Sequence, residues 1–261
     1  MKMAFKLVLL LLSLFLSLGA IAIVRLILAP SEKRIYCAYR INHFFSRIFN
    51  LILGIKINLV ADRKFLRQRG IFFVSNHLSY IDGIAIAGLV PVVFIGRSDL
   101  KSWPIFGLLS TLAYTIFVDR INPSDIHQEI NKIGFFIQKG MNVILFPEGT
   151  STGGKALLPF KSSFFTVAVH TECPVVPVAI KYKSVDNRKI DEGNKDLVYW
   201  YADMDFLPHL FRVLGLDKIE LEIKICKPID IARLKDKNWS LQRKYLSSAS
   251  REAIEQILNA E

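Results

Sequence analysis

A histidine and an aspartate stand five positions apart in the segment Asn76-His-Leu-Ser-Tyr-Ile-Asp82, directly after the apolar run 71–75. A carboxylate that accepts a hydrogen bond from one imidazole nitrogen fixes the tautomer of the ring, and the second nitrogen is then free to accept a proton. Ligand sites of α/β proteins gather at the carboxyl ends of strands, where this pair would lie. The pair therefore predicts a general base, although a turn capped by His77 and a helix that begins at Asp82 would have the same spacing.

A second segment, Phe146-Pro-Glu-Gly-Thr-Ser-Thr-Gly-Gly-Lys-Ala156, matches two motifs at once. The Gly-x-Ser-x-Gly pattern around Ser151 has the spacing of a hydrolase nucleophile elbow, and the glycines that lead to Lys155 have the spacing of a phosphate-binding P-loop. A P-loop needs Ser or Thr after its lysine and a helix directly afterwards. Here Ala156 follows the lysine and Pro159 comes soon after it, so we interpret the P-loop match as coincidence.

The nucleophile elbow is also a poor fit to this segment. An elbow places its serine at the apex of a sharp strand-to-helix turn, whereas Pro147-Glu148 separates the apolar run from the first glycine and two glycines follow the motif. The partners of Ser151 would have to come from Asp203 or Asp205 and from His209, which stand in no distinctive context. We interpret this match as coincidence as well.

The elements that must position these residues alternate along the chain. Short runs rich in Val, Ile and Phe predict strands that are buried on both faces. We expect strands at 55–60, 71–75, 92–96, 114–118, 143–146, 175–182 and 220–225, and helices at 124–139, 161–170 and 240–259. The alternation predicts an α/β fold of three layers, with a mixed, largely parallel sheet covered by helices.

Local signals mark some of the boundaries between these elements. Ser124 is the expected N-cap of the helix 124–139, and Gly140 is its expected end. The polar, charged stretch 183–195 predicts a surface loop.

Composition and charge narrow the class of protein. The chain of 261 residues is 52% hydrophobic, carries a net charge of +11, and has three isolated cysteines. The scattered cysteines indicate neither a metal site nor a disulfide framework and fit a reducing compartment. The positive charge predicts an anionic partner, which is a membrane surface or an acidic carrier protein rather than nucleic acid, because no nucleic-acid recognition motif accompanies it.

The N-terminus favours the membrane. Residues 7–24 form a run of 18 residues without a charge, which is at the lower limit for spanning a bilayer. A cleaved signal peptide and a buried core helix are the alternatives, but the run is long for the first, and a helix that is apolar on every face is rare at a chain start. More basic residues follow the run than precede it, so we expect a membrane anchor with the main domain on the cytoplasmic face, which is that of the inner membrane in a bacterium.

The next segment, 31–53, mixes basic and bulky apolar residues in the pattern of an amphipathic helix. Such a helix suits the headgroup layer of a membrane, but a helix that covers the core and keeps its basic residues in water has the same pattern. The adjacent run favours the membrane. We therefore expect two parts: an anchor with an interfacial helix at 1–53 and an α/β domain at 54–261.

Three further segments follow the histidine block in order: Ile116-Phe-Val-Asp-Arg120, Phe146-Pro-Glu-Gly-Thr150 and Val176-Pro-Val178. The whole set closely resembles the glycerolipid acyltransferase family of the 1-acylglycerol-3-phosphate acyltransferase type. The blocks of that family read NH-x-x-x-x-D, F-[IV]-D-R, F-P-E-G-T-R and V-P-[VI]. The resemblance covers about residues 40–228, and four blocks in the family's order make it specific.

The resemblance implies a role for each matching position. It makes His77 the general base and Asp82 the residue that orients it. The other matching positions are expected to bind substrate: Asp119, Arg120, Glu148, Gly149 and Thr150. Lys161, in Pro159-Phe-Lys161, is also expected to bind substrate, because many relatives carry a basic residue at this place. Among them, the arginine is expected near the phosphate of the substrate, and the third block is expected to help form the acceptor site. No metal or other cofactor is implied.

The reaction implied is transfer of a fatty acyl group from a thioester donor, acyl-CoA or acyl-acyl carrier protein, to the free hydroxyl of a lysophospholipid in the membrane. The expected acceptor is 1-acylglycerol-3-phosphate, which would give phosphatidic acid. The family's third block continues with arginine after Thr150, but this chain has Ser151 there. Because a cation for a phosphomonoester is missing at this position, a lysophospholipid with a larger headgroup or a lyso-ornithine lipid is the alternative acceptor.

Two other classes of protein stay open. A membrane-tethered serine hydrolase would require Ser151 and could dispense with His77. A non-catalytic basic protein at an anionic membrane would need neither residue, and the four blocks would then serve only the fold.

Overall fold

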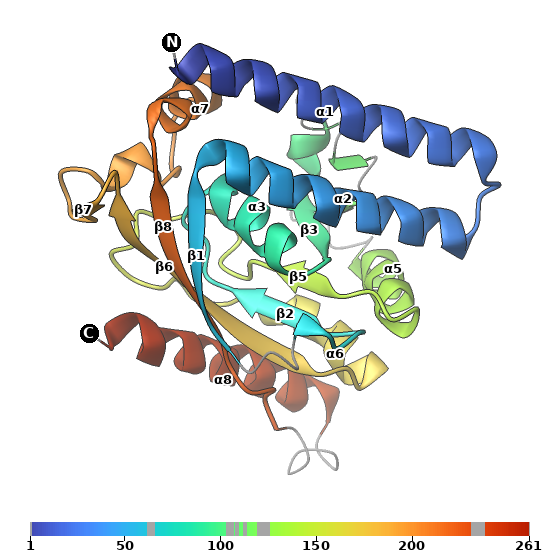
Figure 1. Ribbon diagram of the computed structural model, residues 1–261. Helices are drawn as coiled ribbons and strands as arrows, with labels where there is room; N and C mark the ends of the chain where they lie inside the picture. Colours follow the sequence, from blue (N-terminus) through green and yellow to red (C-terminus); the bar gives the residue numbers. More distant parts are fainter. Residues whose placement is uncertain are drawn as a thin grey trace.

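The fold is organised around one mixed sheet of eight strands (Figure 1). The computed structural model describes residues 2–61, 66–102, 107, 110–111, 114–118, 126–230 and 238–260. Its strands are β1 (Ile55–Val60), β2 (Phe72–Ser75), β3 (Val93–Arg97), β4 (Ile116–Val118), β5 (Val143–Leu145), β6 (Val175–Val185), β7 (Arg188–Lys189) and β8 (Ile219–Ile225). They lie in the order β1-β8-β6-β2-β5-β3-β4, and β7 pairs with β6.

Most neighbouring strands are parallel. β2 pairs in parallel with both β6 and β5, β3 with both β5 and β4, and β1 with β8. The pairs of β6 with β8 and with β7 are antiparallel. Adjacent residues of one strand serve both faces: Phe72 and Phe73, each at most 1% exposed, lie in separate core clusters. The mixed, largely parallel sheet predicted from the sequence is confirmed.

Helices cover both faces of the sheet, which gives three layers (Figure 1). The helices are α1 (Lys2–Ile27), α2 (Glu32–Leu53), α3 (Tyr80–Leu89), α5 (Ile126–Gln138), α6 (Thr166–Thr171), α7 (Phe206–Gly215) and α8 (Trp239–Asn259). Ile81 of α3 and Leu214 of α7 belong to the core cluster of one face. Ile133 of α5, Val167 of α6 and Leu246 of α8 belong to the cluster of the other face. Short 3-10 helices lie at η2 (Ser98–Ser102), η4 (Ser162–Phe165) and η5 (Lys195–Leu197).

Local signals explain several boundaries. Gly140, with φ of 74°, takes the left-handed conformation just past α5 and its N–H bonds to Ile137 O, as expected for a glycine that ends a helix. The predicted N-cap Ser124 lies outside the described residues. The helix predicted at 161–170 begins as the 3-10 turn η4 and becomes α-helical only from Thr166.

The prediction of a surface loop at 183–195 was wrong for its first part. β6 continues to Val185, and β7 pairs back against the end of β6 as a β-hairpin. Asp186 and Asn187 both have positive φ, 48° and 62°, the combination of a type I′ hairpin turn. The polar composition was misleading, because a hairpin that projects from a sheet carries the same charged residues as a loop.

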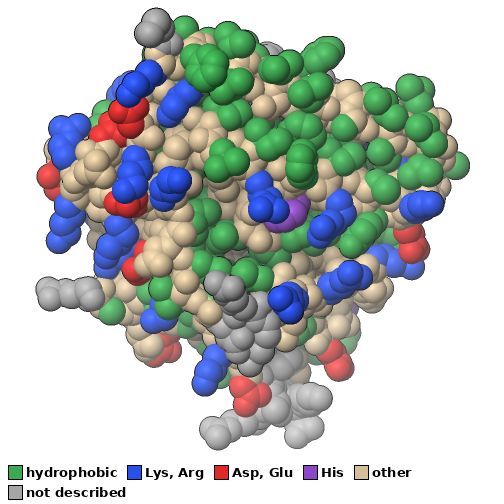
Figure 2. Space-filling model, viewed as in Figure 1, with side chains coloured by type: hydrophobic (Ala, Val, Ile, Leu, Met, Phe, Trp, Pro, Cys, Tyr) green, Lys and Arg blue, Asp and Glu red, His purple; other side chains and the backbone are tan. Residues whose placement is uncertain are grey.

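The helix α1 is long and apolar enough to cross a membrane, with a mean hydropathy of 2.9 in its most apolar window, of which 17% is buried. It packs against α2 and α7, and its buried residues are Ser13, Ser17 and Ile21. Its exposed side is apolar, as Figure 2 shows for the face that carries α1. The large exposed side chains are Met3, Phe5, Val8, Leu11, Leu12, Phe15, Leu16, Ile23, Leu26 and Ile27.

The helix α2 has two faces. Its N-cap is Ser31, whose hydroxyl accepts a hydrogen bond from the N–H of Arg34. Its inner face packs against α1 and α3 and buries Tyr39 and Phe45, whereas Arg40 and Arg47 are exposed. Because α1 and α2 pack on the face that also carries α3, the division of the chain into parts 1–53 and 54–261 stays a prediction.

Candidate active site

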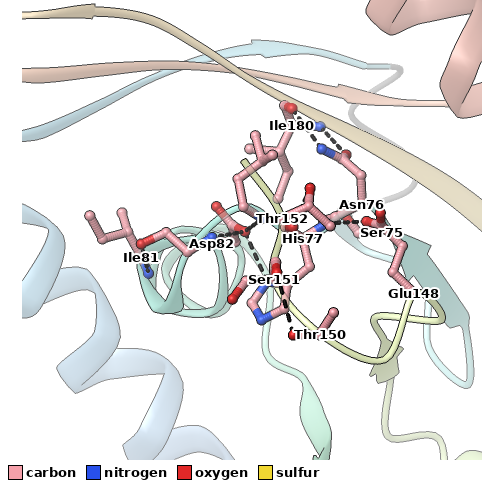
Figure 3. A network of polar contacts seen from close by, with 12 residues as sticks. Ser75, Asn76, His77, Ile81, Asp82, Glu148, Thr150, Ser151, Thr152 and Ile180 are labelled. Atoms are coloured by element: carbon pink, nitrogen blue, oxygen red, sulfur yellow. Dashed lines mark hydrogen bonds and ion pairs between the residues drawn. The ribbon is translucent and has the colours of Figure 1, made fainter. Parts of the chain in front are cut away.

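The site forms where two neighbouring parallel strands end. β2 and β5 pair in register from Phe72 with Val143 to Val74 with Leu145, so the segments that follow them leave the same edge of the sheet. His77 follows β2 and Glu148 follows β5. The backbone N–H of His77 donates to Glu148 Oε1 at 2.8 Å, which joins the two segments (Figure 3). The topology therefore brings the first and third sequence blocks together.

His77 and Asp82 form the pair that the sequence predicted. His77 Nδ1 lies 2.9 Å from Asp82 Oδ2 (Figure 3). Asp82 is held at this place because it is the third residue of α3 and closes a capping box with the N-cap Ser79. Its side chain is fully buried, whereas that of His77 is 21% exposed. The sequence offered a helix that begins at Asp82 and a His–Asp pair as alternatives. Both occur, since the residue in the first turn of the helix also holds the imidazole.

The contacts of Asp82 fix the protonation pattern of the pair. Besides His77, its Oδ2 accepts the backbone N–H groups of Leu78 at 2.6 Å and Ser79 at 2.9 Å, and its Oδ1 accepts the hydroxyl of Tyr182 at 2.7 Å. A carboxylate that accepts from all these donors is ionised, so the imidazole nitrogen Nδ1 must carry its proton and donate it. The other nitrogen, Nε2, then has a lone pair that can accept a proton.

The ring of His77 is held from one side and open on another. Phe146 stacks on the imidazole, with ring centroids 4.1 Å apart and an interplanar angle of 20°. The backbone C=O of His77 accepts the N–H of Thr152 at 2.9 Å. Within the described ranges, no residue forms a hydrogen bond to Nε2 of His77. The arrangement therefore directs Nδ1 of His77 to Asp82 and leaves Nε2 available to a substrate.

Glu148 makes its contacts inside the protein. Its Oε1 accepts the N–H of His77, and its Oε2 accepts the N–H of Leu158 at 3.0 Å. The residue is 5% exposed. Burial raises the pKa of the Glu148 carboxyl, while the two backbone N–H groups act in the opposite direction. The observed contacts make Glu148 a brace between the histidine and the loop 150–161, and its expected contact with the acceptor stays a prediction.

Gly149 and Thr150 of the third block stand where this loop begins, and Lys161 stands at its end. Gly149 has φ of 84°, a conformation that favours glycine, and its N–H closes the turn onto Phe146 O at 3.1 Å. Thr150 is exposed, and its hydroxyl donates to Ser151 O at 3.3 Å. Lys161 is exposed at the end of the loop, where its N–H donates to Pro147 O at 3.0 Å. The structure thus brings the third block beside His77, whereas Asp119 and Arg120 lie outside the described residues.

Ser151 lacks the surroundings of a nucleophile. It is 9% exposed, and its hydroxyl makes no hydrogen bond to His77 or to any other residue that the structure describes. The chain after Ser151 is irregular up to η4, so no helix follows the serine and neither an elbow nor a P-loop is formed. A serine nucleophile needs a base within hydrogen-bond reach, and none of the residues that the structure describes supplies one to Ser151.

Sequence reasoning did not assign roles to several residues that build the site. Asn76 uses its side-chain amide to exchange two hydrogen bonds with the backbone of Ile180, at 2.8 and 3.0 Å (Figure 3). It thereby ties the end of β2 to β6, just before the histidine. The sequence signal for this role was the place of Asn76 in the first block, directly before the histidine. Phe146 and Tyr182 gave no such signal, because an aromatic residue in or beside an apolar strand indicates only a residue of the hydrophobic core.

Comparison with known proteins agrees with this fold and shows the family of the chain. The family model described as Acyltransferase matches residues 56–181. The chain is 32% identical over 194 residues to the lyso-ornithine lipid O-acyltransferase of Rhizobium meliloti (strain 1021), covering 72% of this chain and 66% of that enzyme. It is 30% identical over 205 residues to the enzyme of the same name from Brucella abortus (strain 2308), covering 76% of each chain.

A further relative and a solved structure complete the comparison. The 1-acyl-sn-glycerol-3-phosphate acyltransferase of Neisseria gonorrhoeae is 29% identical over 187 residues, which are 72% of this chain and 70% of that enzyme. The crystal structure of the 1-acyl-sn-glycerophosphate (LPA) acyltransferase PlsC from Thermotoga maritima matches with a TM-score of 0.62 and 22% identity, covering 100% of this chain and 99% of that one. This last likeness confirms the fold.

The chain belongs to the acyltransferase family. Within it, the relatives are O-acyltransferases of glycerolipids and of ornithine lipids. The family and the enzyme class predicted from the four sequence blocks are thereby confirmed.

Proposed function

We propose that this protein transfers a fatty acyl group from a thioester to the free hydroxyl of a lysolipid, with His77 as general base. Nε2 of His77 takes the hydroxyl proton while the oxygen attacks the thioester carbonyl, so that the new C–O bond forms as the C–S bond breaks. The imidazolium that results keeps its Nδ1–H on Asp82. The observation that carries the proposal is the His77–Asp82 pair, held at 2.9 Å with Nε2 unoccupied by any described residue.

The reaction needs few catalytic groups besides the general base. A thiol has a pKa of about 8.5, so its thiolate is a good leaving group near neutral pH. A positioned general base contributes about 10²–10⁴-fold to such a transfer. Direct attack by the lipid hydroxyl needs no covalent acyl-enzyme, which agrees with a Ser151 hydroxyl that has no hydrogen-bond partner among the described residues.

Two acceptors are candidates. The four blocks and the Neisseria relative favour 1-acylglycerol-3-phosphate. Ser151, which stands where the family has arginine, and the two relatives named for lyso-ornithine lipid favour that lipid instead. An arginine pairs best with a compact phosphate dianion, through charge-assisted and often bidentate hydrogen bonds. Because the buried Ser151 offers no such pairing, we propose lyso-ornithine lipid as the preferred acceptor and 1-acylglycerol-3-phosphate as the second candidate.

A panel of acceptors tests this proposal. Initial rates of acylation would be measured for the purified full-length protein with lyso-ornithine lipid, 1-acylglycerol-3-phosphate and lysophospholipids of larger headgroup, each with acyl-CoA and with acyl-acyl carrier protein. We expect the highest rate with lyso-ornithine lipid. A higher rate with 1-acylglycerol-3-phosphate would establish the second candidate, and no acylation of any lysolipid would contradict the proposed function.

We further propose that the exposed side of α1 holds the protein at the cytoplasmic face of a membrane. Two observations support this location: the apolar side chains gathered on α1, and the basic residues that follow α1 in the sequence. Because α1 also packs against α2 and α7, the membrane has to meet the domain along this face.

Paired substitutions test the membrane contact. Leu12 and Phe15 of α1 are 51% and 72% exposed, so Leu12→Glu with Phe15→Glu disturbs the surface and not the core. Placing charges in an apolar membrane layer costs on the order of 1 kcal/mol or more per residue, so vesicle binding should fall at least about tenfold. The matched control is Leu241→Glu with Tyr245→Glu on α8, which lies across the sheet from α1 (Figure 1). Equal retention of both double variants in vesicle sedimentation would contradict the proposed contact.

A further inference from the structure

The carboxylate that orients His77 is itself held from its far side. Tyr182 lies on β6 and donates its hydroxyl to Asp82 Oδ1 at 2.7 Å. Tyr182 is 4% exposed and Asp82 is fully buried. The other carboxylate oxygen, Oδ2, accepts the imidazole and two backbone N–H groups. Tyr182 is therefore the only donor to Oδ1 within the described part of the chain.

The sheet fixes the position of this tyrosine. β6 is parallel to β2, and the side chain of Asn76 continues their pairing onto Ile180, two residues before Tyr182. On its outer side, the tyrosine packs edge-on against Tyr199, with ring centroids 5.1 Å apart. Tyr182 itself pairs with Leu221 of β8, so the sheet on both sides of β6 and the ring of Tyr199 together fix the position of its side chain.

The electrostatics of the pair keep Tyr182 a donor. Burial, and then the negative charge of Asp82, raise the pKa of the Tyr182 phenol well above its ordinary value. The phenol therefore stays protonated near neutral pH and donates its hydrogen to Asp82. Two further titratable groups lie near the pair, the carboxyl of Glu148 and the phenol of Tyr199. Burial raises the pKa of the Tyr199 phenol to about 12, so it brings no charge to the pair. Neither group forms a hydrogen bond to Asp82.

We propose that Tyr182 is a positioning residue for the acyl transfer: its hydrogen bond orients Asp82 and tempers the negative charge that the carboxylate presents to His77. A carboxylate that loses a hydrogen bond is more basic and stabilises the imidazolium more strongly. Tyr182 would then set the lowest pH at which His77 is still the neutral base. This inference rests on the proposed function, because it assumes that His77 is the base.

The test is the pH profile of Tyr182→Phe. We expect kcat to fall about tenfold with little change in KM, since a displaced base affects the reaction and not the binding of substrate. The acid limb of the kcat/KM profile should move to higher pH by about half a unit, in the direction of a stronger imidazolium–carboxylate pair. A role in packing alone would lower the melting temperature and leave the pH profile unmoved.

The matched control is Tyr199→Phe. It removes the same hydroxyl from the neighbouring ring without touching Asp82, so its pH profile should equal that of the wild type. A second variant covers the case in which Tyr182→Phe does not fold. In it, 3-fluorotyrosine at position 182, introduced by codon suppression, keeps the ring and the hydroxyl. Its more acidic phenol donates more strongly, so the acid limb should move to lower pH.

An unmoved acid limb in either Tyr182 variant would overturn the inference, and so would an equal shift in Tyr199→Phe. Failure of the proposed function has a different signature, because His77→Ala would then keep its activity whatever the Tyr182 variants do.

Discussion

His77→Ala is expected to reduce acyl transfer about 10²–10⁴-fold while the protein remains folded and membrane-bound. The reason is that the hydroxyl of the acceptor must lose its proton as it attacks, and alanine leaves no group to take it. Asp82→Asn should cost about 10²-fold or more, because an amide no longer fixes the Nδ1–H tautomer. The measurement is the initial rate of lysolipid acylation, with circular dichroism to confirm that each variant is folded.

His170→Ala is the matched control for this experiment. His170 is exposed at the end of α6, on the other face of the sheet, where its ring packs against Trp239. This variant should keep the rate of the wild type. Substantial activity in His77→Ala would show that His77 is not the general base and would contradict the proposed mechanism.

Glu148→Ala is expected to have the second largest effect, a loss of about 10²-fold in kcat. The carboxylate holds the backbone N–H groups of His77 and Leu158, and a displacement of a catalytic group by about 1 Å can cost 10²-fold. The loss of each of these partly buried hydrogen bonds also costs about 1 kcal/mol, so the melting temperature should fall as well. Steady-state kinetics and a thermal melt on the same preparation measure both effects.

The balance between kcat and KM separates two roles for Glu148. If it braces His77, kcat falls and KM for the lysolipid changes little. A large rise in KM with unchanged kcat and melting temperature would instead mean that Glu148 contacts the acceptor, as the family resemblance implies. Ser151→Ala on the same loop serves as control and should retain most of the activity, since its hydroxyl has no described partner.

Much of the sheet could be predicted because its strands are apolar runs with clear ends. The predicted strand 55–60 coincides with β1, whereas β6 runs on past the predicted end of 175–182 to Val185. The difference is physical. β6 leaves the buried centre of the sheet and continues as a hairpin, where charged residues replace the apolar pattern. The helix α7 was not predicted, because Pro208 and His209 interrupt its short apolar segment.

The site could be predicted in part. His77 and Asp82 are five residues apart, so their pairing is local and visible in the sequence. Tyr182 meets Asp82 across 100 positions, and only the order of strands in the sheet brings them together. The hydrogen-bonding role of Glu148 has the same origin, because it depends on β5 lying beside β2.

The helix α2 shows where a pattern alone leaves two readings. Its mixture of basic and apolar residues fitted both a membrane surface and a cover for the core. In the structure, one side of the helix buries Tyr39 and Phe45 against its neighbours, while Arg40 and Arg47 are exposed. A sequence pattern identifies an amphipathic helix, but it does not tell whether lipid or protein meets each side.

The release of thiol from an acyl thioester, with and without lysolipid, tests the central claim most directly. The wild-type protein would be mixed with acyl-CoA or acyl-acyl carrier protein, free thiol would be followed over time, and the lipid products would be identified by mass spectrometry. Direct acyl transfer predicts that thiol appears only when a lysolipid is present, with one thiol for each acyl group found in the new lipid. Thiol released at the same rate without lysolipid, as free fatty acid or as a burst that leaves acylated protein, would contradict it.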